Sequence, residues 1–310
     1  MADLVHRVNP GVFVKAIHVR KYWGKIWMSF LASLISLCFI IPLVISITNS
    51  LMEEGEIHDN YLAVESRSEV GDVVNSDKQY ATIKLIPDEL TFSQYYQVLV
   101  KQNDFVFFFW NSIKIVLPII LGQLIIASMA AFAFAKLKFA CKEQLFFIYI
   151  ITMLMPYQVT LVPNYIIADK LNLIGNYLSI IFPGVFSTFG VFLLRQFMIF
   201  IPDEYCEAAK VDGAGYFHIF TRIILPMTKA GLASLTILLL IDNWNMVEQA
   251  VVFLNEIKDY PLSVALSQLN QSQMGVAFAA STLYMAPLLL VFLYGENYLV
   301  EGLQLSGIKG

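Results

Sequence analysis

The residues whose types and spacing could do chemistry gather in one polar stretch, Ile201–Met227, which separates two long apolar segments. Its opening residues, Pro202 and Asp203, predict a helix start, because proline is tolerated in a first turn and aspartate can accept the free amide protons there. A short helix over Glu204–Lys210 follows. The next polar pair, Asp212 and Gly213, predicts a tight turn.

A second helix is predicted over Tyr216–Leu225, because apolar residues recur at helical spacing before Pro226 ends the pattern. The region around the turn is rich in small residues, so another surface could approach its backbone closely: Ala208, Ala209, Gly213 and Ala214. The acid Glu207 offers a charged contact. The stretch is therefore either a docking site for another protein or an amphipathic loop on a membrane surface. Residue chemistry alone leaves both possibilities open.

A second polar cluster interrupts the apolar segment Thr228–Phe253. It consists of Asp242, Asn243, Trp244 and Asn245. A lone charge inside a membrane helix costs about 2.5–3.5 kcal/mol on insertion scales, so the cluster needs a purpose or a partner. It either lines a transport path, with Asn243, Trp244 and Asn245 as the candidate contacts, or marks a helix break at the outer interface with Trp244 as an aromatic anchor.

Enzyme chemistry has little support in the sequence. No G-x-x-x-x-G-K-[ST] phosphate loop occurs, and none of the four histidines stands at metal-ligand spacing from a cysteine or an acid. No nucleophile has a base close to it in sequence. We therefore expect no catalytic residue, no cofactor and no metal site in this chain.

The composition indicates an integral membrane protein. Of the 310 residues, 58% are hydrophobic and 14% charged. The formal net charge is −4, and the charged residues are divided unevenly among the loops. Nucleic acid is not an expected partner. The mean hydropathy is +0.66. Apolar segments long enough to cross a bilayer predict six transmembrane helices, at Trp27–Asn49, Phe107–Ala135, Leu145–Ile167, Tyr177–Phe200, Thr228–Phe253 and Val276–Val300.

Charge sets the expected orientation. The segment 1–26 is basic, and basic residues also follow the second and fourth spans, which places both termini in the cytoplasm. The loop 53–104 is mostly acidic and is expected outside, either as a docking surface for a soluble protein or as a tether. A weak alternation at Tyr80–Ile86 predicts a short strand there, and 255–273 predicts an outer loop with a possible re-entrant helix.

The third predicted span has an unusual pattern. Two prolines, Pro156 and Pro163, interrupt it, and polar residues stand beside them: Gln158, Thr160 and Asn164. Irregular backbone at membrane depth is tolerated only where it faces protein or a water-filled cavity. We therefore expect this span to face protein or water rather than lipid.

The string EAAKVDGAG, with ILP beyond it, closely resembles the EAA loop of ABC importer permeases, in which a coupling helix enters a cleft on the ATP-hydrolysing subunit. The segments AFAFAKLKF and GLQLSGIKG also resemble this family, in particular the shorter of the two permeases in carbohydrate importers of the maltose type. The residues that match the EAA pattern are Glu207, Ala208, Ala209, Asp212, Gly213, Ala214, Leu225 and Pro226.

The resemblance implies an all-α integral membrane protein of the MetI-like type, with a cytoplasmic N-terminal segment (1–26), a six-span permease domain (27–310), an outer loop (53–104) and a coupling loop (201–227). It implies that the protein lies in the lipid bilayer of a prokaryotic cell membrane. The implied partners are a second permease subunit, two ATPase subunits that bind ATP-Mg, and an extracytoplasmic solute-binding protein. The implied function is carbohydrate import. A permease for another small polar solute and a secondary carrier are the alternatives.

Overall fold

The computed structural model describes residues 10–61, 84–101, 104–268 and 273–307, and every regular element in these ranges is helical. The chain divides into two compact units, Met1–Gln94 and Tyr95–Gly310, which are described separately. The predicted strand at Tyr80–Ile86 lies partly outside the described residues. For the described part the prediction is wrong, because Lys84 has no regular structure and Leu85 and Ile86 form a bend without ladder pairing.

The first unit begins with a long helix, α1 (Pro10–Asn49), of which residues Lys25–Asn49 are apolar enough to cross a membrane. A short acidic helix, α2 (Glu54–Tyr61), follows it. The Lys84 ammonium lies 3.0 Å from Oε1 of Glu56 in α2 and also contacts Asp88. The segment around Lys84 therefore lies against α2. Residues 62–83 of the acidic loop expected to meet a soluble protein lie outside the described residues.

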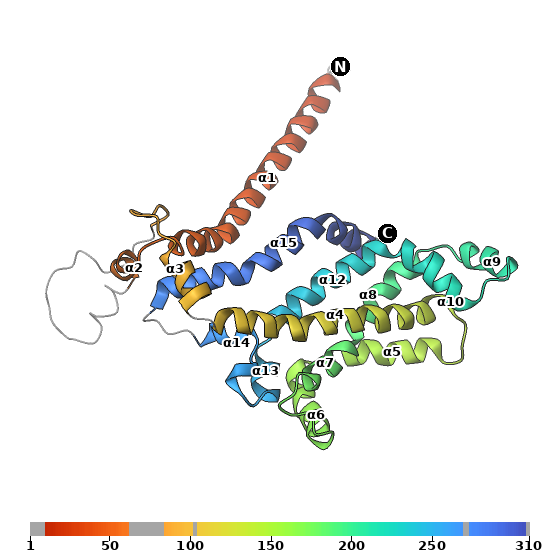
Figure 1. The fold of residues 1–310 in the computed structure, drawn as a ribbon. Coiled ribbons are helices and arrows are strands. Elements are labelled where there is room, and N and C mark those ends of the chain that lie inside the picture. Colours follow the sequence, from red (N-terminus) through yellow and green to blue (C-terminus); the bar gives the residue numbers. More distant parts are fainter. Residues whose placement is uncertain (1–9, 62–83, 102–103, 269–272, 308–310) are drawn as a thin grey trace, which may run out of the picture. The chain divides into compact units, whose positions relative to one another are not determined.

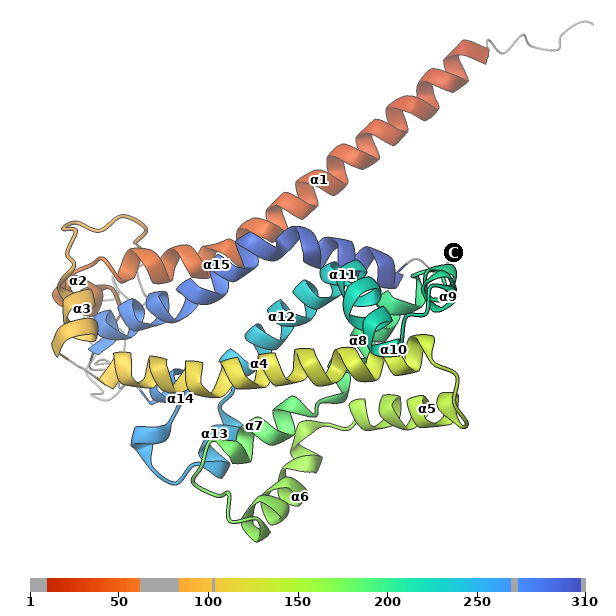
Figure 2. The ribbon, with the colours of Figure 1, turned by 45° about the vertical axis from the view of Figure 1, so that its right-hand side comes forward.

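The second unit packs around α4 (Asp104–Lys136), which lies against α7, α8, α12 and α14 (Figures 1 and 2). The longest remaining helix, α15 (Met274–Gly307), packs on α12. The other elements are α3 (Ser93–Tyr96), which crosses the division between the units, η2 (Gln97–Lys101), α5 (Lys142–Met153), α6 (Tyr157–Lys170), α7 (Leu178–Val185), α8 (Thr188–Ile199), α9 (Glu204–Val211), α10 (Tyr216–Ile219), η3 (Phe220–Ile224), α11 (Leu225–Met227), α12 (Lys229–Trp244), α13 (Glu248–Phe253), η4 (Ile257–Asp259) and α14 (Leu262–Ser267).

Small residues allow the helices to approach α4 closely. A Cβ added at Gly122 would lie 2.6 Å from a methyl group of Val185, and one added at Gly190 would lie 2.8 Å from Nε2 of Gln123. Near the start of α4, the buried Asn111 donates to the carbonyl oxygen of Lys258 at 2.7 Å, and Ser112 accepts the amide of Leu262 at 2.8 Å. These polar contacts fix the 258–262 segment on α4.

Three of the predicted spans are broken rather than continuous. The third divides into α5 and α6, which bend by 100° at Leu154–Pro156, while Pro163 lies inside α6. The fourth is divided at Phe186–Ser187. The predicted fifth span ends early, because α12 stops at Trp244 and α13 begins only at Glu248. Proline and polar residues explain the breaks, since each leaves backbone groups that apolar surroundings could not satisfy.

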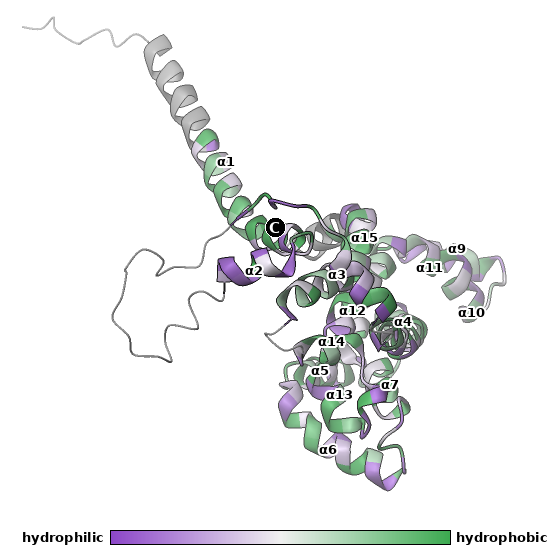
Figure 3. Cartoon of the chain, turned by 60° about the vertical axis from the view of Figure 1, so that its left-hand side comes forward, coloured by the Kyte–Doolittle hydropathy of each residue, from purple (hydrophilic) through white to green (hydrophobic). Residues whose placement is uncertain are grey.

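The apolar helices agree with six spans. Among the residues that the structure describes, four helical segments are long and apolar enough to cross a membrane, and the number rises to six when each strongly bent helix pair counts as one span. Hydropathy colouring shows a long apolar run on α1 and a polar segment at α2 (Figure 3). The expected helix in the 255–273 loop is present as α14.

Candidate functional site

The EAA loop, Ile201–Met227, forms a helix and a tight turn. The helix α9 ends at Val211, Asp212 is its C-cap, and Gly213 takes the left-handed conformation with φ 84°. The amide of Ala214 then donates to the carbonyl oxygen of Ala209 at 2.9 Å, which closes the turn. Because glycine adopts the left-handed backbone conformation at almost no cost in free energy, Gly213 is suited to end α9 in this way.

One face of α9 is buried and the other is presented outward. Cys206 and Ala209 pack into the main apolar core beside Ile219 and Ile224, whereas Glu207 and Ala208 are exposed. The loop also exposes large apolar side chains, notably Val211 (88% exposed) and Phe217 (72%). Next to them is a cavity of about 500 Å³, lined by Ala209, Asp212, Gly213, Ala214, Gly215, His218 and Ile223. Apolar side chains beside polar ones mark a surface suited to a protein partner.

The eight residues that match the EAA pattern do not all lie together. Glu207 to Ala214 share α9 and its turn, but Leu225 and Pro226 lie in α11, next to a 75° bend that separates 216–227 from α12. A π-helical turn, η3, precedes α11, and such turns are frequent at functional sites. The second group therefore sets the direction in which the loop enters α12.

Lys136, the last residue of α4, fixes the start of the loop. Its ammonium lies 2.6 Å from Oδ1 of Asp203 and donates to the carbonyl oxygen of Ile201, and its side chain is only 4% exposed. The prediction that Asp203 caps α9 with its side chain is wrong, because the carboxylate faces this lysine instead. Hydrogen bonding to Lys136 lowers the pKa of Asp203 below its usual value.

A second cation lies close to the same region. The Arg195 guanidinium in α8 stacks 3.8 Å from the ring centre of Phe146 in α5, donates to the carbonyl oxygen of Phe134 in α4, and reaches Glu143 at 3.4 Å. Together, Lys136 and Arg195 connect α4, α5, α8 and the EAA loop.

We expect Lys136→Met to loosen the loop without preventing assembly. The substitution keeps the apolar stem but leaves the Ile201 carbonyl oxygen without its donor, at a cost of about 1–2 kcal/mol. Thermal unfolding of the purified complex should occur several degrees lower. The ion-pair part of the effect should be complete above about pH 4 and disappear as the pH falls through the lowered pKa of Asp203.

Lys138→Met removes the same charge from an exposed neighbour and serves as the control. Equal unfolding temperatures for the two variants would contradict the role of Lys136.

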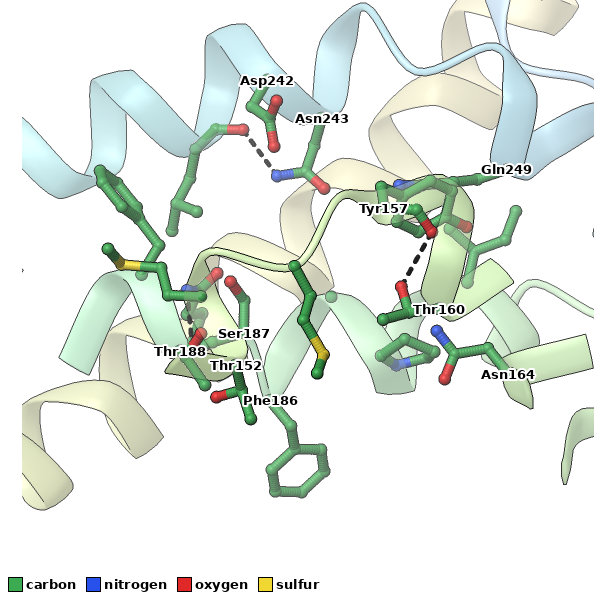
Figure 4. A pocket seen from close by; sticks show the side chains of 18 of the residues that line it. Thr152, Tyr157, Thr160, Asn164, Phe186, Ser187, Thr188, Asp242, Asn243 and Gln249 are labelled. Carbon is green, nitrogen blue, oxygen red and sulfur yellow. Dashed lines mark hydrogen bonds between the residues drawn. The ribbon is translucent and has the colours of Figure 1, made fainter. Parts of the chain in front are cut away.

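The second candidate site is a polar groove formed where the broken helices meet. A cavity of about 490 Å³ has walls from α4, α5, α6, α7, α8, α12 and α13, and an adjoining cavity of about 540 Å³ extends along 241–249. Both are lined by Tyr157, Asp242, Asn243 and Gln249, and we call the two together the groove. Figure 4 shows Asp242 and Asn243 projecting from α12 toward Ser187 and Tyr157.

The groove has polar atoms that the protein does not satisfy. Gln123 is fully buried on α4, where its Nε2 donates to the carbonyl oxygen of Ser187 at 3.4 Å, while its Oε1 has no partner within the described residues. Asn243 donates through Nδ2 to the carbonyl oxygen of Leu239 at 2.8 Å. Thr160 and Asn164 also line the groove, which agrees with the expected protein-facing or water-facing side of the third span.

The structure separates the three residues expected along a transport path. Asn243 lines both cavities. Trp244 is buried at 3% exposure, packs against Phe109 and Tyr284, and lines neither cavity. Asn245 lines the second cavity, but its Nδ2 donates to Ile241 and its Oδ1 accepts the Tyr284 hydroxyl at 2.7 Å. The end of α12 therefore combines a cavity wall with a packed helix terminus.

Sequence reasoning missed Gln123 and Ser187. A single amide within the apolar run of α4 was the available indication for Gln123. Ser187 carried no comparable indication, because it becomes part of the groove only where α7 ends and α8 begins.

Comparison with known proteins decides the family. Residues 113–303 match the family described as binding-protein-dependent transport system inner membrane component. The chain belongs to this family. It is 26% identical over 232 residues to the arabinooligosaccharides transport system permease protein AraQ of Halalkalibacterium halodurans, covering 74% of this chain and 83% of that protein.

A further relative supports the assignment, and a solved structure shares the fold. The permease is 30% identical over 199 residues to the sn-glycerol-3-phosphate transport system permease protein UgpE of Brucella abortus, covering 63% of this chain and 71% of that protein. Its fold is similar to a bacterial ABC transporter involved in the import of the acidic polysaccharide alginate, with a TM-score of 0.73 and 23% identity over 90% of this chain and 97% of that one.

The permease is thus a multi-pass membrane subunit of an ABC importer and a transport component rather than an enzyme. Its family works with an ATPase and a binding protein. The secondary-carrier alternative is excluded by the family.

Proposed function

We propose that the permease forms one half of the translocation path of an ATP-driven carbohydrate importer and that its EAA loop docks on the ATPase. The observation that carries this proposal is the position of the groove. It lies where α5 meets α6, α7 meets α8 and α12 meets α13, within apolar segments in which irregular backbone is tolerated only beside protein or a water-filled cavity. Its free polar atoms can bind a hydroxyl-rich solute.

The relatives favour a carbohydrate over another small polar solute, because their names refer to arabinooligosaccharides, sn-glycerol-3-phosphate and alginate. We infer that a second permease subunit supplies the other half of the path, that two ATPase subunits bind ATP-Mg, and that an extracytoplasmic binding protein delivers the solute. The complex lies in a prokaryotic cell membrane, with both termini of this chain in the cytoplasm.

In the proposed mechanism, ATP brings the two ATPase subunits together, and the docked EAA loop follows them. Lys136 and Arg195 join that loop to α4, α5 and α8, three of the elements that line or support the groove. A displacement of α9 would thereby reach the groove, which would open alternately to the two sides of the membrane.

The test is ATP-dependent uptake by the complete complex in proteoliposomes. A neutral radiolabelled oligosaccharide should accumulate only when ATP is enclosed on the ATPase side and binding protein is supplied on the other. Uptake driven by an ion gradient without ATP would contradict the proposal. ATP-dependent uptake of an amino acid or peptide, with none of any sugar, would favour the alternative of another polar solute.

A further inference from the structure

Two amides that line the groove use their donors within the protein. Gln123 gives its Nε2 to Ser187 and keeps a buried Oε1 without a partner among the described residues. Asn243 gives its Nδ2 to Leu239, so its Oδ1 remains for a ligand. A solute in the groove therefore meets the Asn243 oxygen together with the donor-capable side chains of Asn164 and Gln249, a mixed set that suits hydroxyl groups, which both donate and accept.

The charge of the groove has one sign. Its two ionisable acids are Asp242 and Glu248, and no lysine, arginine or histidine lines either cavity. Glu248 accepts from Nε2 of Gln158 at 3.2 Å. Within the described parts of the chain, no cation forms an ion pair with Asp242, which is exposed to the groove.

Helix dipoles do not offset this charge. Each break places the negative end of one helix beside the positive end of the next: α5 beside α6, α7 beside α8, and α12 beside α13. The partial charges at the two sides of a break have opposite signs and similar size, so they largely cancel. The carboxylates then dominate the potential of the groove, where low-dielectric walls strengthen it.

We propose that Asp242 makes this section of the path selective by charge, so that it admits neutral, polyhydroxylated solutes and rejects anionic sugars such as uronates and sugar phosphates. The inference rests on the proposed function, because it assumes that the groove belongs to the path. The names of the relatives and of the solved structure include a neutral class, arabinooligosaccharides, and two anionic solutes, sn-glycerol-3-phosphate and alginate. The inference assigns this permease to the neutral class. Asp242 acts as a specificity-determining residue, with Glu248 adding to the same potential.

A thiol-reactivity experiment tests the potential directly. Thr160→Cys places a thiol in the groove, in a complex whose native cysteines are replaced by Cys38→Ser, Cys141→Ser and Cys206→Ala. Reaction rates are measured with a cationic reagent, methanethiosulfonate ethylammonium, and an anionic one, methanethiosulfonate ethylsulfonate. Adding Asp242→Asn should lower the ratio of cationic to anionic rates at least fivefold, on the order expected for removal of one nearby charge.

Asp169→Asn, which removes the same charge from a residue of α6 that lines neither cavity, is the control and should leave the ratio unchanged. Should Asp242→Asn prevent assembly, Asp242→Ser is measured in its place. An unchanged ratio in the assembled variant overturns the inference.

A second measurement separates the inference from the proposed function. Turnover with the neutral oligosaccharide used for uptake should alter the rate at Thr160→Cys if the groove belongs to the path. Suppose that turnover leaves the reaction rate at Thr160→Cys unchanged while Asp242→Asn lowers the ratio of cationic to anionic rates. The negative potential of the groove is then correct, but the groove is not part of the path, and the proposed selectivity is overturned with it. An altered rate with an unchanged ratio leaves the path in place and overturns only the charge selectivity.

Discussion

The double variant Glu207→Ala and Gly213→Asp should abolish import while leaving the complex assembled in the membrane. Glu207 is exposed on α9, so its removal leaves no buried group unsatisfied. Gly213 has φ 84°, so an aspartate there carries about 1–2 kcal/mol of backbone strain. No atom lies within 4 Å of a Cβ built on it, so the added carboxylate projects into the space that a docked ATPase would occupy. We expect import to fall about 100-fold or more, equivalent to about 2.7 kcal/mol of lost coupling.

The measurement is uptake and substrate-stimulated ATP hydrolysis by the same proteoliposomes, with assembly checked by size-exclusion chromatography. The matched control is Glu204→Ala with Gly215→Asp, which makes the same chemical changes at another exposed glutamate of α9 and at a glycine of ordinary φ. Normal import and normal stimulation in the Glu207 and Gly213 variant would remove the docking role from the EAA loop.

Asn243→Ala and Asn245→Ala should behave differently, although the residues are two positions apart. Asn243 contributes a free oxygen to the groove, so its loss should raise the substrate concentration for half-maximal import about tenfold, equivalent to about 1.4 kcal/mol. Asn245 accepts the Tyr284 hydroxyl, so its loss should lower thermal stability by about 1–2 kcal/mol with little change in that concentration.

Concentration series for import and thermal unfolding of both variants distinguish these outcomes. Because binding protein delivers the solute, the series is run at saturating binding protein over a range of sugar. If Asn243→Ala left the sugar concentration for half-maximal import unchanged, the end of α12 would have a purely structural role.

Local patterns in the sequence were sufficient for the membrane class, the six apolar segments and the helix–turn–helix form of the EAA loop. Each depends on residues close together in the chain. Apolar runs must lie in lipid, and the Asp212–Gly213 turn ends α9 through its own backbone preference. The helix start at 203–204 was placed correctly, yet the role of Asp203 was not, since its partner Lys136 lies on another helix.

The tertiary structure decided everything that depends on separate segments meeting. Asn243, Trp244 and Asn245 are equivalent candidates along the chain, but each side chain meets a different neighbour. Asn243 and Asn245 both line a cavity, Asn245 is also held by Tyr284, and Trp244 is buried in the core. Gln123 and Ser187 joined the groove only through the close approach at Gly190 and the break after α7. Sequence alone determined which segments enter the membrane, and packing between distant segments determined which polar atoms remain free for a solute.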